Sequence, residues 1–267
     1  MNAPWLSEVA WRRAIVQADR RFRWGRLGQD YVGEWVGLLL LRLDPNGEIK
    51  TAIGAPDVSP ASLEKITNGE GAAFARSIRG KVSLHAAAVA IGASGVVLSG
   101  LSGSGKSTAA FHLCSSHGGE LLADDITGLD VAGDAAVFAE PRERFSWLCD
   151  GHGDKHPRPV RIAERAVGLG ALVRLGFDDR LREAELRPVR GARAVSHVLD
   201  ALLRFDVGFE TWASEFEVAT ALAASVPVFD LERPLATPSE EIAELVVSLV
   251  QLIGDQSLPK TPGQCRG

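Results

Sequence analysis

The segment Gly100–Ser107, with the sequence Gly-Leu-Ser-Gly-Ser-Gly-Lys-Ser, constrains this chain more than any other. It matches the glycine-rich phosphate-binding loop, or P-loop. Residues 95–98 before it are apolar and predict a short buried strand, while Thr108–Leu113 predicts the opening of a helix. In that setting backbone N–H groups converge on phosphate oxygens at a helix N-terminus. We therefore expect a nucleoside triphosphate to bind here.

Every residue of this loop is a candidate nucleotide ligand: Gly100, Leu101, Ser102, Gly103, Ser104, Gly105, Lys106, Ser107 and Thr108. Lys106 is expected to reach the β- and γ-phosphates and to be catalytic, and the Ser107 hydroxyl is expected to bind Mg²⁺. The expected cofactors are ATP and Mg²⁺.

Length, net charge and cysteine content narrow the class of protein to which the chain can belong. A chain of 267 residues allows one large domain or two small ones, and a net charge of −5 argues against a nucleic-acid partner. Three scattered cysteines indicate neither a disulfide framework nor a zinc site. The apolar run 36–41 is too short to span a bilayer, and no secretory signal is recognisable. We expect a cytoplasmic protein without a membrane partner, and a homo-oligomer is possible.

Three regions are predicted along the chain: a β-rich region at 1–80, a catalytic α/β domain at 81–254, and a disordered tail at 255–267. In the first region we expect strands at Arg21–Trp24 and Tyr31–Leu43, a hairpin between 36–43 and 48–53, and helices at 60–66 and 71–78.

The C-terminal part of the catalytic region is expected to be mostly helical. Apolar residues with helical spacing predict one helix through Ala194–Leu203 and another through Ile242–Ile253. Thr237–Glu240 is typical of a helix start, and Gly254 predicts the stop. Between the two helices, Val226–Leu231 predicts a strand.

Two adjacent carboxylates, Asp124 and Asp125, end the apolar run Leu121–Ala123. A buried strand delivers such acids to the carboxyl edge of a sheet, where P-loop enzymes hold Mg²⁺. Neighbouring side chains of an extended segment point in different directions, so one carboxylate can hold the metal while the other acts as general base. The alternative is that both merely end the strand at a turn.

Two further groups of polar residues are candidates. His85 lies in the apolar segment Ser83–Val89, one hairpin before the loop, and is either a core histidine or an active-site residue. Residues 151–157 contain Lys155, His152 and His156, and this polar loop could close over the nucleotide; it is a weak candidate for a metal site.

Taken together, the segments Leu84–Val89, Gly100–Ser107 and Leu121–Asp125 resemble the catalytic domain of HPr kinase/phosphorylase, over about residues 80–177. The resemblance implies the α/β fold shared with phosphoenolpyruvate carboxykinases, with an N-terminal β-rich region and C-terminal helices added. It also implies transfer of the ATP γ-phosphoryl group to a protein serine. By position, His85 matches the active-site histidine, Asp124 the catalytic acid/base and Asp125 the metal-associated partner.

The chain departs from that family in several places. The family's Glu-rich Gly-Leu-Gly signature has no counterpart, and Val167–Leu172 predicts the start of a strand instead. The family's catalytic arginine has three possible counterparts, Arg142, Arg161 and Arg204. These departures favour a kinase-only relative of the type that phosphorylates a serine of a ribosomal precursor peptide, as in lasso-peptide maturation.

Three alternatives remain at the level of sequence. The acceptor could be a folded carrier protein such as HPr. The chain could instead be a nucleotide-binding sensor or scaffold without transferase activity, although a pure binder does not need a second acid beside the metal ligand. It could also be a small-molecule kinase or a carboxykinase-like enzyme.

Overall fold

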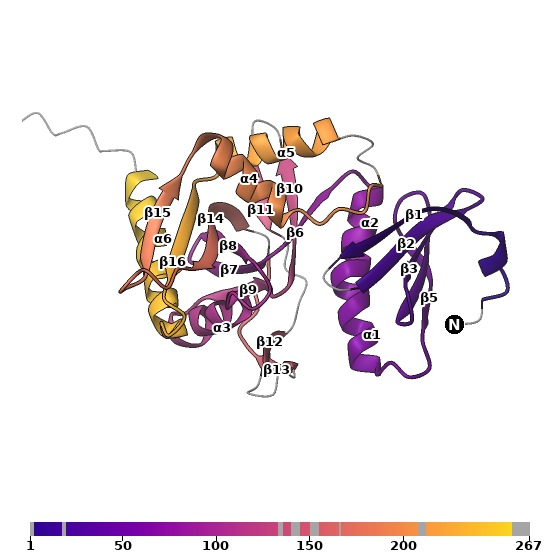
Figure 1. Ribbon diagram of the computed structural model, residues 1–267, viewed down its shortest axis with the longest axis horizontal. Coiled ribbons are helices and arrows are strands. Elements are labelled where there is room, and N and C mark those ends of the chain that lie inside the picture. Colours follow the sequence, from indigo (N-terminus) through magenta and orange to yellow (C-terminus); the bar gives the residue numbers. More distant parts are fainter. Residues whose placement is uncertain are drawn as a thin grey trace, which may run out of the picture.

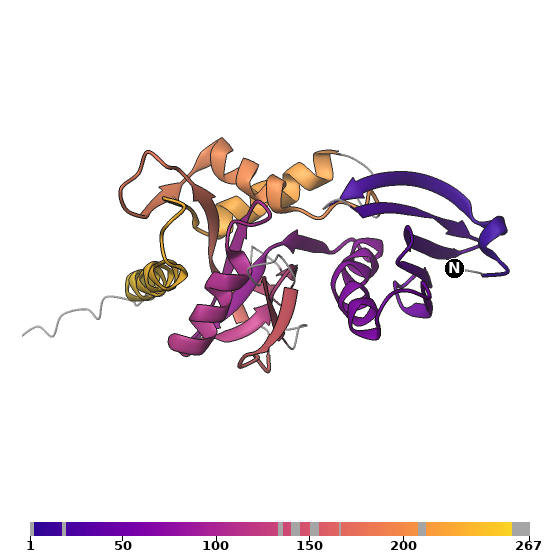
Figure 2. The same cartoon turned by 60° about the horizontal axis from the view of Figure 1, so that its bottom comes forward.

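The computed structural model describes residues 3–17, 20–132, 136–139, 145–149, 155–165, 167–207 and 212–257. Within these residues the chain is a mixed α/β protein with a five-stranded sheet, a nine-stranded sheet and a separate two-stranded hairpin. Figure 1 shows the five-stranded sheet at one end of the molecule, with helices α1 and α2 between it and the larger sheet, and the turned view of Figure 2 shows the same order.

The first sheet is an antiparallel meander. Its elements are the short 3₁₀ helix Leu6–Glu8 and the strands β1 (Ala10–Gln17), β2 (Arg20–Leu27), β3 (Asp30–Trp35), β4 (Leu39–Leu43) and β5 (Ile49–Gly54). The expected hairpin is confirmed as β4–β5, and the Asp44 side chain accepts bonds from the backbone N–H groups of Asn46 and Glu48 at 2.8 and 2.9 Å. The single strand expected over 31–43 is wrong, because the chain turns between β3 and β4 at Gly37, whose φ is 77°.

Both helices expected after this sheet are present, as α1 (Pro60–Ile66) and α2 (Ala72–Ile78), joined by a π-helical turn over Thr67–Gly71. Pro60 occupies the first turn of α1, where its missing N–H costs nothing. The Ser59 hydroxyl accepts from the Ser62 N–H at 3.2 Å and so caps the helix.

The larger sheet contains β6 (Val82–His85), β7 (Ala87–Ile91), β8 (Ser94–Gly100), β9 (Glu120–Ala123), β10 (Ile126–Ala132), β11 (Ala136–Ala139), β14 (Val167–Phe177), β15 (Glu185–Val189) and β16 (Val228–Arg233). The helices around it are α3 (Lys106–Ser116), α4 (Gly191–Ala201), α5 (Trp212–Ser225) and α6 (Ser239–Ser257), and the hairpin is β12 (Phe145–Cys149) with β13 (Lys155–Pro159). The strands expected at 95–98 and from Val167 are confirmed as β8 and β14.

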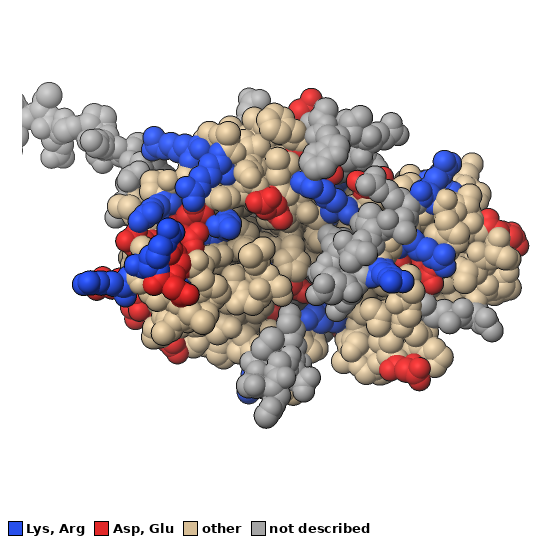
Figure 3. All heavy atoms as spheres, viewed as in Figure 1, with Lys and Arg blue, Asp and Glu red and all other residues tan. Residues whose placement is uncertain are grey.

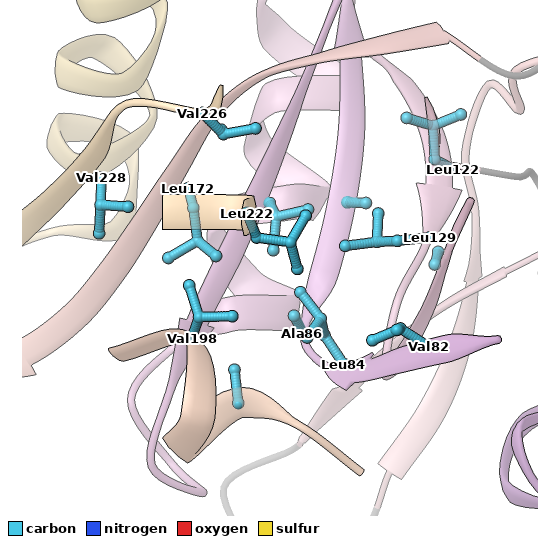
Figure 4. Close-up of a cluster of buried hydrophobic side chains, with 14 of the residues drawn as sticks. Val82, Leu84, Ala86, Leu122, Leu129, Leu172, Val198, Leu222, Val226 and Val228 are labelled. Atoms are coloured by element: carbon cyan, nitrogen blue, oxygen red, sulfur yellow. The ribbon is translucent and has the colours of Figure 1, made fainter. Parts of the chain in front are cut away.

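Three parallel strands form the centre of this sheet. β14 pairs in parallel with β8 on one side and with β16 on the other. The side chains of β8 alternate between two cores: Val97 packs toward α4 and α5, while Val96 and Leu98 pack toward α3 and α6. Figure 4 shows the first of these cores, in which Leu172 of β14 lies among Val198, Leu222 and Val228. Burial on both faces explains why β8 and most of β14 are apolar.

Two bends connect consecutive strands of the larger sheet. The expected strand 83–89 is broken at Ala86 into β6 and β7, and Asp124 and Asp125 separate β9 from β10. The bends face each other, because His85 pairs with Ile126, Ala88 pairs with Ala123, and the Ala86 N–H donates to the Asp125 carbonyl at 3.0 Å.

The C-terminal elements differ from the sequence expectation in three details. The helix expected through Leu203 ends at Ala201, and the strand expected at 226–231 is β16, two residues later. Gly254 does not end the last helix, which continues to Ser257. Partly buried Ile253 packs against the core between α3 and α6, which outweighs the roughly 1 kcal/mol that an interior glycine costs. Residues 258–267 of the expected tail lie outside the described residues.

In the described part of the chain, none of the helices combines the length and apolar character needed to span a membrane. On the face in Figure 3, basic and acidic side chains are interspersed beside β15, where Arg187 pairs with Glu185 and Arg180 with Asp178.

A cluster of aromatic side chains joins the first sheet to the rest of the molecule. Phe205, which follows α4, packs edge-on against Phe22 of β2 and Phe74 of α2, with ring centroids 5.1 and 5.6 Å apart. Phe205 is 2% exposed, so it contributes to a core shared by segments far apart in the sequence.

We predict that Phe205→Ala lowers the free energy of unfolding by about 3–5 kcal/mol, because it leaves a cavity in this core. Phe216→Ala is the matched control: Phe216 is 56% exposed on α5, and its loss should change stability by no more than about 0.5 kcal/mol. Urea unfolding measures both values. Equal effects of the two substitutions would contradict the shared core.

Candidate functional site

The glycine-rich loop lies between β8, which ends at Gly100, and α3, which begins at Lys106. Gly100 has a φ of 135°, a conformation that only glycine adopts readily, and a Cβ there would lie 2.4 Å from the Leu175 carbonyl oxygen of β14. Gly105 has a φ of 86° immediately before the helix. The strand–loop–helix setting predicted from the sequence is therefore present, and the glycines are required by the backbone path.

Lys106 folds back onto the loop that precedes it. Its ammonium group donates to the carbonyl oxygens of Gly100 and Leu101 at 2.9 and 3.1 Å, and the residue is 7% exposed. The positive charge is thus held against the loop backbone, beside the N-terminus of α3. Both features favour an anion at this position.

Asp124 is almost completely buried, with 1% exposure, at the end of β9. It accepts from the Trp147 N–H at 2.8 Å and from the Ser146 hydroxyl at 3.1 Å, both on β12. Burial raises the pKa of the Asp124 carboxyl above its ordinary value, although these hydrogen bonds and one with Ser107 oppose the rise. The first carboxylate of the pair therefore contacts the last serine of the glycine-rich loop.

Asp125 has a different environment. Its Oδ1 lies 3.7 Å from Nε2 of His85, and both side chains are about one third exposed, at 30% and 31%. The opposed bends of the sheet bring these two residues together, since His85 and Ile126 are paired across β6 and β10. The sequence singled out His85 but could not show that it meets Asp125.

An open cavity of about 590 Å³ adjoins the first half of the glycine-rich loop. Its lining includes His85, Ser99, Leu101, Arg174, His197 and Asp200, which come from β6, β8, β14, α4 and the loop. Ser99 is 2% exposed, and its hydroxyl has no hydrogen-bond partner in the described part of the chain. This surface offers both cationic and acidic groups next to the loop.

Asp230 of β16, 2% exposed, fixes part of this cavity wall. Its carboxylate lies 2.9 Å from Nε2 of His197 and 3.5 Å from the Arg174 guanidinium, and it also pairs with Arg193. Arg174 is held further by Glu232, at 3.1 Å. A buried carboxylate paired with two guanidinium groups is compensated, so it can orient its partners.

Sequence reasoning missed Arg174, His197 and Asp230. A signal did exist for two of them: Arg174 is the one charged residue of the central strand β14, and Asp230 is the one charged residue of the strand expected at 226–231. Charge in such a strand needs a partner or a ligand.

The remaining candidates lie away from the loop or outside the described residues. Arg142 and His152 fall outside them, and the same holds for the Lys155 side chain. Arg161 is exposed and pairs with Glu120, whereas Arg204 pairs with Glu215. His156 is exposed on β13. Among the described residues, no three His, Cys, Asp or Glu side chains are grouped so that they could hold a metal ion.

Comparison with solved structures gives a likeness of fold. The chain is similar to the HPr(Ser) kinase/phosphatase from Coxiella burnetii, with 12% identity and a TM-score of 0.38, over 65% of this chain and 97% of that one. At this TM-score the likeness carries no weight for residues or activity. No protein-family model matches the chain, and neither does any curated protein sequence.

We predict that Gly100→Ala destabilises the protein by about 1–3 kcal/mol more than Gly92→Ala, because the new Cβ meets the backbone of β14. Gly92 is the matched control: it also has a positive φ, 61°, but a Cβ there meets nothing within 4 Å. Urea unfolding gives the two stabilities. Equal losses would mean that the loop can relax away from β14.

Proposed function

We propose that this protein is a kinase that transfers the γ-phosphoryl group of ATP, in the presence of Mg²⁺, to a serine hydroxyl. The observation that carries the proposal is the loop Gly100–Ser107 itself. It connects a buried central strand to a helix, it holds the Lys106 ammonium against its own carbonyls, and its last serine contacts a buried carboxylate. Phosphoryl transfer needs positioned charge more than covalent chemistry from the protein, and this set of residues supplies it.

The donor set fits a magnesium nucleotide. The loop's N–H groups, the N-terminus of α3 and Lys106 suit a polyphosphate, and Ser107 with an aspartate supplies the oxygen ligands that Mg²⁺ prefers. When bound, ATP would supply the phosphoryl group, and Lys106 would neutralise charge on its β- and γ-phosphates. Gly100, Leu101, Ser102, Gly103, Ser104, Gly105 and Thr108 complete the proposed nucleotide-binding segment.

The two carboxylates have separate proposed roles. We assign proton acceptance to Asp124, because burial raises its pKa toward the range in which a carboxylate can act as general base. Asp125 would serve the metal together with Ser107, and His85 would orient Asp125 from 3.7 Å. The contact between Asp124 and Ser107 supports the opposite division, in which Asp124 holds the metal and Asp125 with His85 takes the proton.

The proposed acceptor is a flexible peptide. The open cavity beside Leu101 and His85 gives a serine a route to the loop without a broad docking surface. The absence of the Glu-rich Gly-Leu-Gly signature favours a kinase acting on a ribosomal precursor peptide of the lasso type over one acting on a folded carrier such as HPr. A peptide must be ordered on binding, which costs affinity but allows a small contact area.

A small anionic acceptor is the second candidate. Arg174 and His197 line the cavity, and Asp230 holds both side chains in place. A cavity of about 590 Å³ with a preoriented guanidinium and imidazole is of the size that small ligands occupy.

Incubation with γ-labelled ATP and Mg²⁺ tests the activity. A serine-containing precursor peptide from the same genome, purified HPr and a set of small hydroxy acids would serve as acceptors. Label on the peptide alone supports the proposal, and label on HPr or on a hydroxy acid identifies another acceptor class. ATP binding without transfer to any of them would instead support a sensor or scaffold.

Lys106→Ala should reduce transfer by at least about a hundredfold, because it removes the cation beside the transferred group. Lys81→Ala is the control: Lys81 is also a lysine in an ion pair, with Asp130 at 2.9 Å, but it lies before β6 and away from the loop. Its transfer rate should match the wild type. Near-normal turnover of Lys106→Ala would refute the assignment of the loop.

The Asp pair is tested with Mg²⁺ titrations of two variants. Asp124→Asn should lower turnover about a hundredfold or more while leaving the affinity for ATP·Mg²⁺ within a few-fold, as loss of a positioned base does. Asp125→Asn should raise the Mg²⁺ concentration needed for half-maximal rate. The reverse pattern would exchange the two roles, and small equal effects would mean that both residues only end a strand.

A further inference from the structure

Arg233, the last residue of β16, is buried against the glycine-rich loop. It is 5% exposed, and its Nη2 donates to the Ser104 carbonyl at 2.9 Å. A Cβ on Gly105 would lie 2.7 Å from the same nitrogen, so the guanidinium lies directly against the turn that precedes α3. The Phe177 ring lies below it, 4.5 Å from Cζ.

The buried charge of Arg233 has no carboxylate partner among the residues that the structure describes. Its buried Nε also has no hydrogen-bond partner there. Burial alone lowers the pKa of this arginine. An isolated buried charge is costly, and natural proteins normally pair it.

A second buried arginine, Arg76, is paired with a carboxylate, as buried charges in proteins usually are. Arg76 of α2 is 1% exposed, and it pairs with Asp130 at 2.8 Å and donates to the carbonyls of Val82 and Leu129. The same fold thus compensates one buried guanidinium completely and leaves the other with a single carbonyl contact and an aromatic ring.

The hydrogen bond from Arg233 to the Ser104 carbonyl also fixes the orientation of the Ser104–Gly105 peptide. In a trans peptide the C=O and the N–H point in opposite directions, so a donor on the Ser104 carbonyl turns the Gly105 N–H away from Arg233. A charged donor on the carbonyl polarises the peptide group and strengthens its N–H as a donor. Arg233 therefore lies on one side of the loop peptide and directs its N–H to the other.

We propose that Arg233 is a positioning residue for phosphate binding: it orients the Ser104–Gly105 peptide, and its missing counter-charge is the polyphosphate of the bound nucleotide. This inference rests on the proposed function of the loop. It gives the nucleotide a second buried cation, besides Lys106, that the sequence motif does not contain. A low-dielectric setting makes such an attraction stronger than it would be at the surface.

The test compares Arg233→Met, Arg233→Gln and Arg233→Lys with the wild type and with Arg76→Met. Two quantities are measured for each protein: the melting temperature without ligand, and the affinity for ADP and for inorganic pyrophosphate with Mg²⁺. Arg76→Met is the matched control, because it also removes a buried guanidinium but lies in α2, away from the loop.

We expect Arg233→Met to keep or raise the melting temperature while weakening pyrophosphate and ADP binding about tenfold or more, since it removes an uncompensated charge. Arg233→Lys should restore most of the affinity. Arg233→Gln keeps a donor for Ser104 without the charge, so it should bind more weakly than the wild type but more tightly than Arg233→Met; it also serves if the methionine variant does not fold. Arg76→Met should melt at a lower temperature with unchanged affinity.

A lower melting temperature of Arg233→Met with wild-type affinity would overturn the inference and leave Arg233 a structural residue. Wild-type affinity of Arg233→Gln would overturn the role of the charge. If the wild type itself binds neither ADP nor pyrophosphate, the proposed function of the loop fails, and that result is distinct from failure at Arg233 alone.

Discussion

The parallel pairing of β8, β14 and β16 is the constraint on which the candidate site depends. Parallel strands end at the same edge, so the glycine-rich loop after β8 lies beside Arg174 near the end of β14 and Arg233 at the end of β16. β9 runs in the same direction, because β7 is antiparallel to both β8 and β9, and this brings the Asp pair to that edge as well. Ligands of open α/β sheets bind outside the carboxyl ends of their strands.

Three buried charged residues lie near this edge of the sheet, and the charge of each is offset differently. Asp230 pairs with the guanidinium groups of Arg174 and Arg193, so its burial is compensated within the protein. Asp124 accepts hydrogen bonds from Ser146 and Trp147, and burial raises the pKa of its carboxyl. Arg233 has one hydrogen bond, to the Ser104 carbonyl, and no carboxylate partner in the described part of the chain, and an arginine cannot lose its proton at neutral pH. All three charged groups lie at the same edge of one sheet. They therefore differ in how their charge is offset because each has different neighbouring side chains.

The sequence correctly predicted those elements whose conformation depends on residues close together in the chain. The glycine loop, the helix at 60–66 and the β4–β5 hairpin each rest on residues a few positions apart, and each was found where expected. Arg233 and Asp230 were not found, because their partners lie far away in the sequence and only the strand order brings them together. The predicted end of the last helix at Gly254 is wrong for the same reason. Tertiary contacts of Ile253 outweigh the tendency of glycine to end a helix.

Two cationic side chains, Lys106 and Arg233, bind backbone carbonyls of the glycine-rich loop, and their roles differ. Lys106 has a flexible stem and three rotatable donors, so it can exchange the Gly100 and Leu101 carbonyls for phosphate oxygens when an anion arrives. Arg233 is planar, buried and fixed by Ser104 and Phe177, so it can only maintain the shape of the loop and its potential. A site with one mobile and one fixed cation is organised before the ligand binds and still adjusts to it. Preorganisation of this kind lowers the reorganisation that phosphoryl transfer would otherwise require.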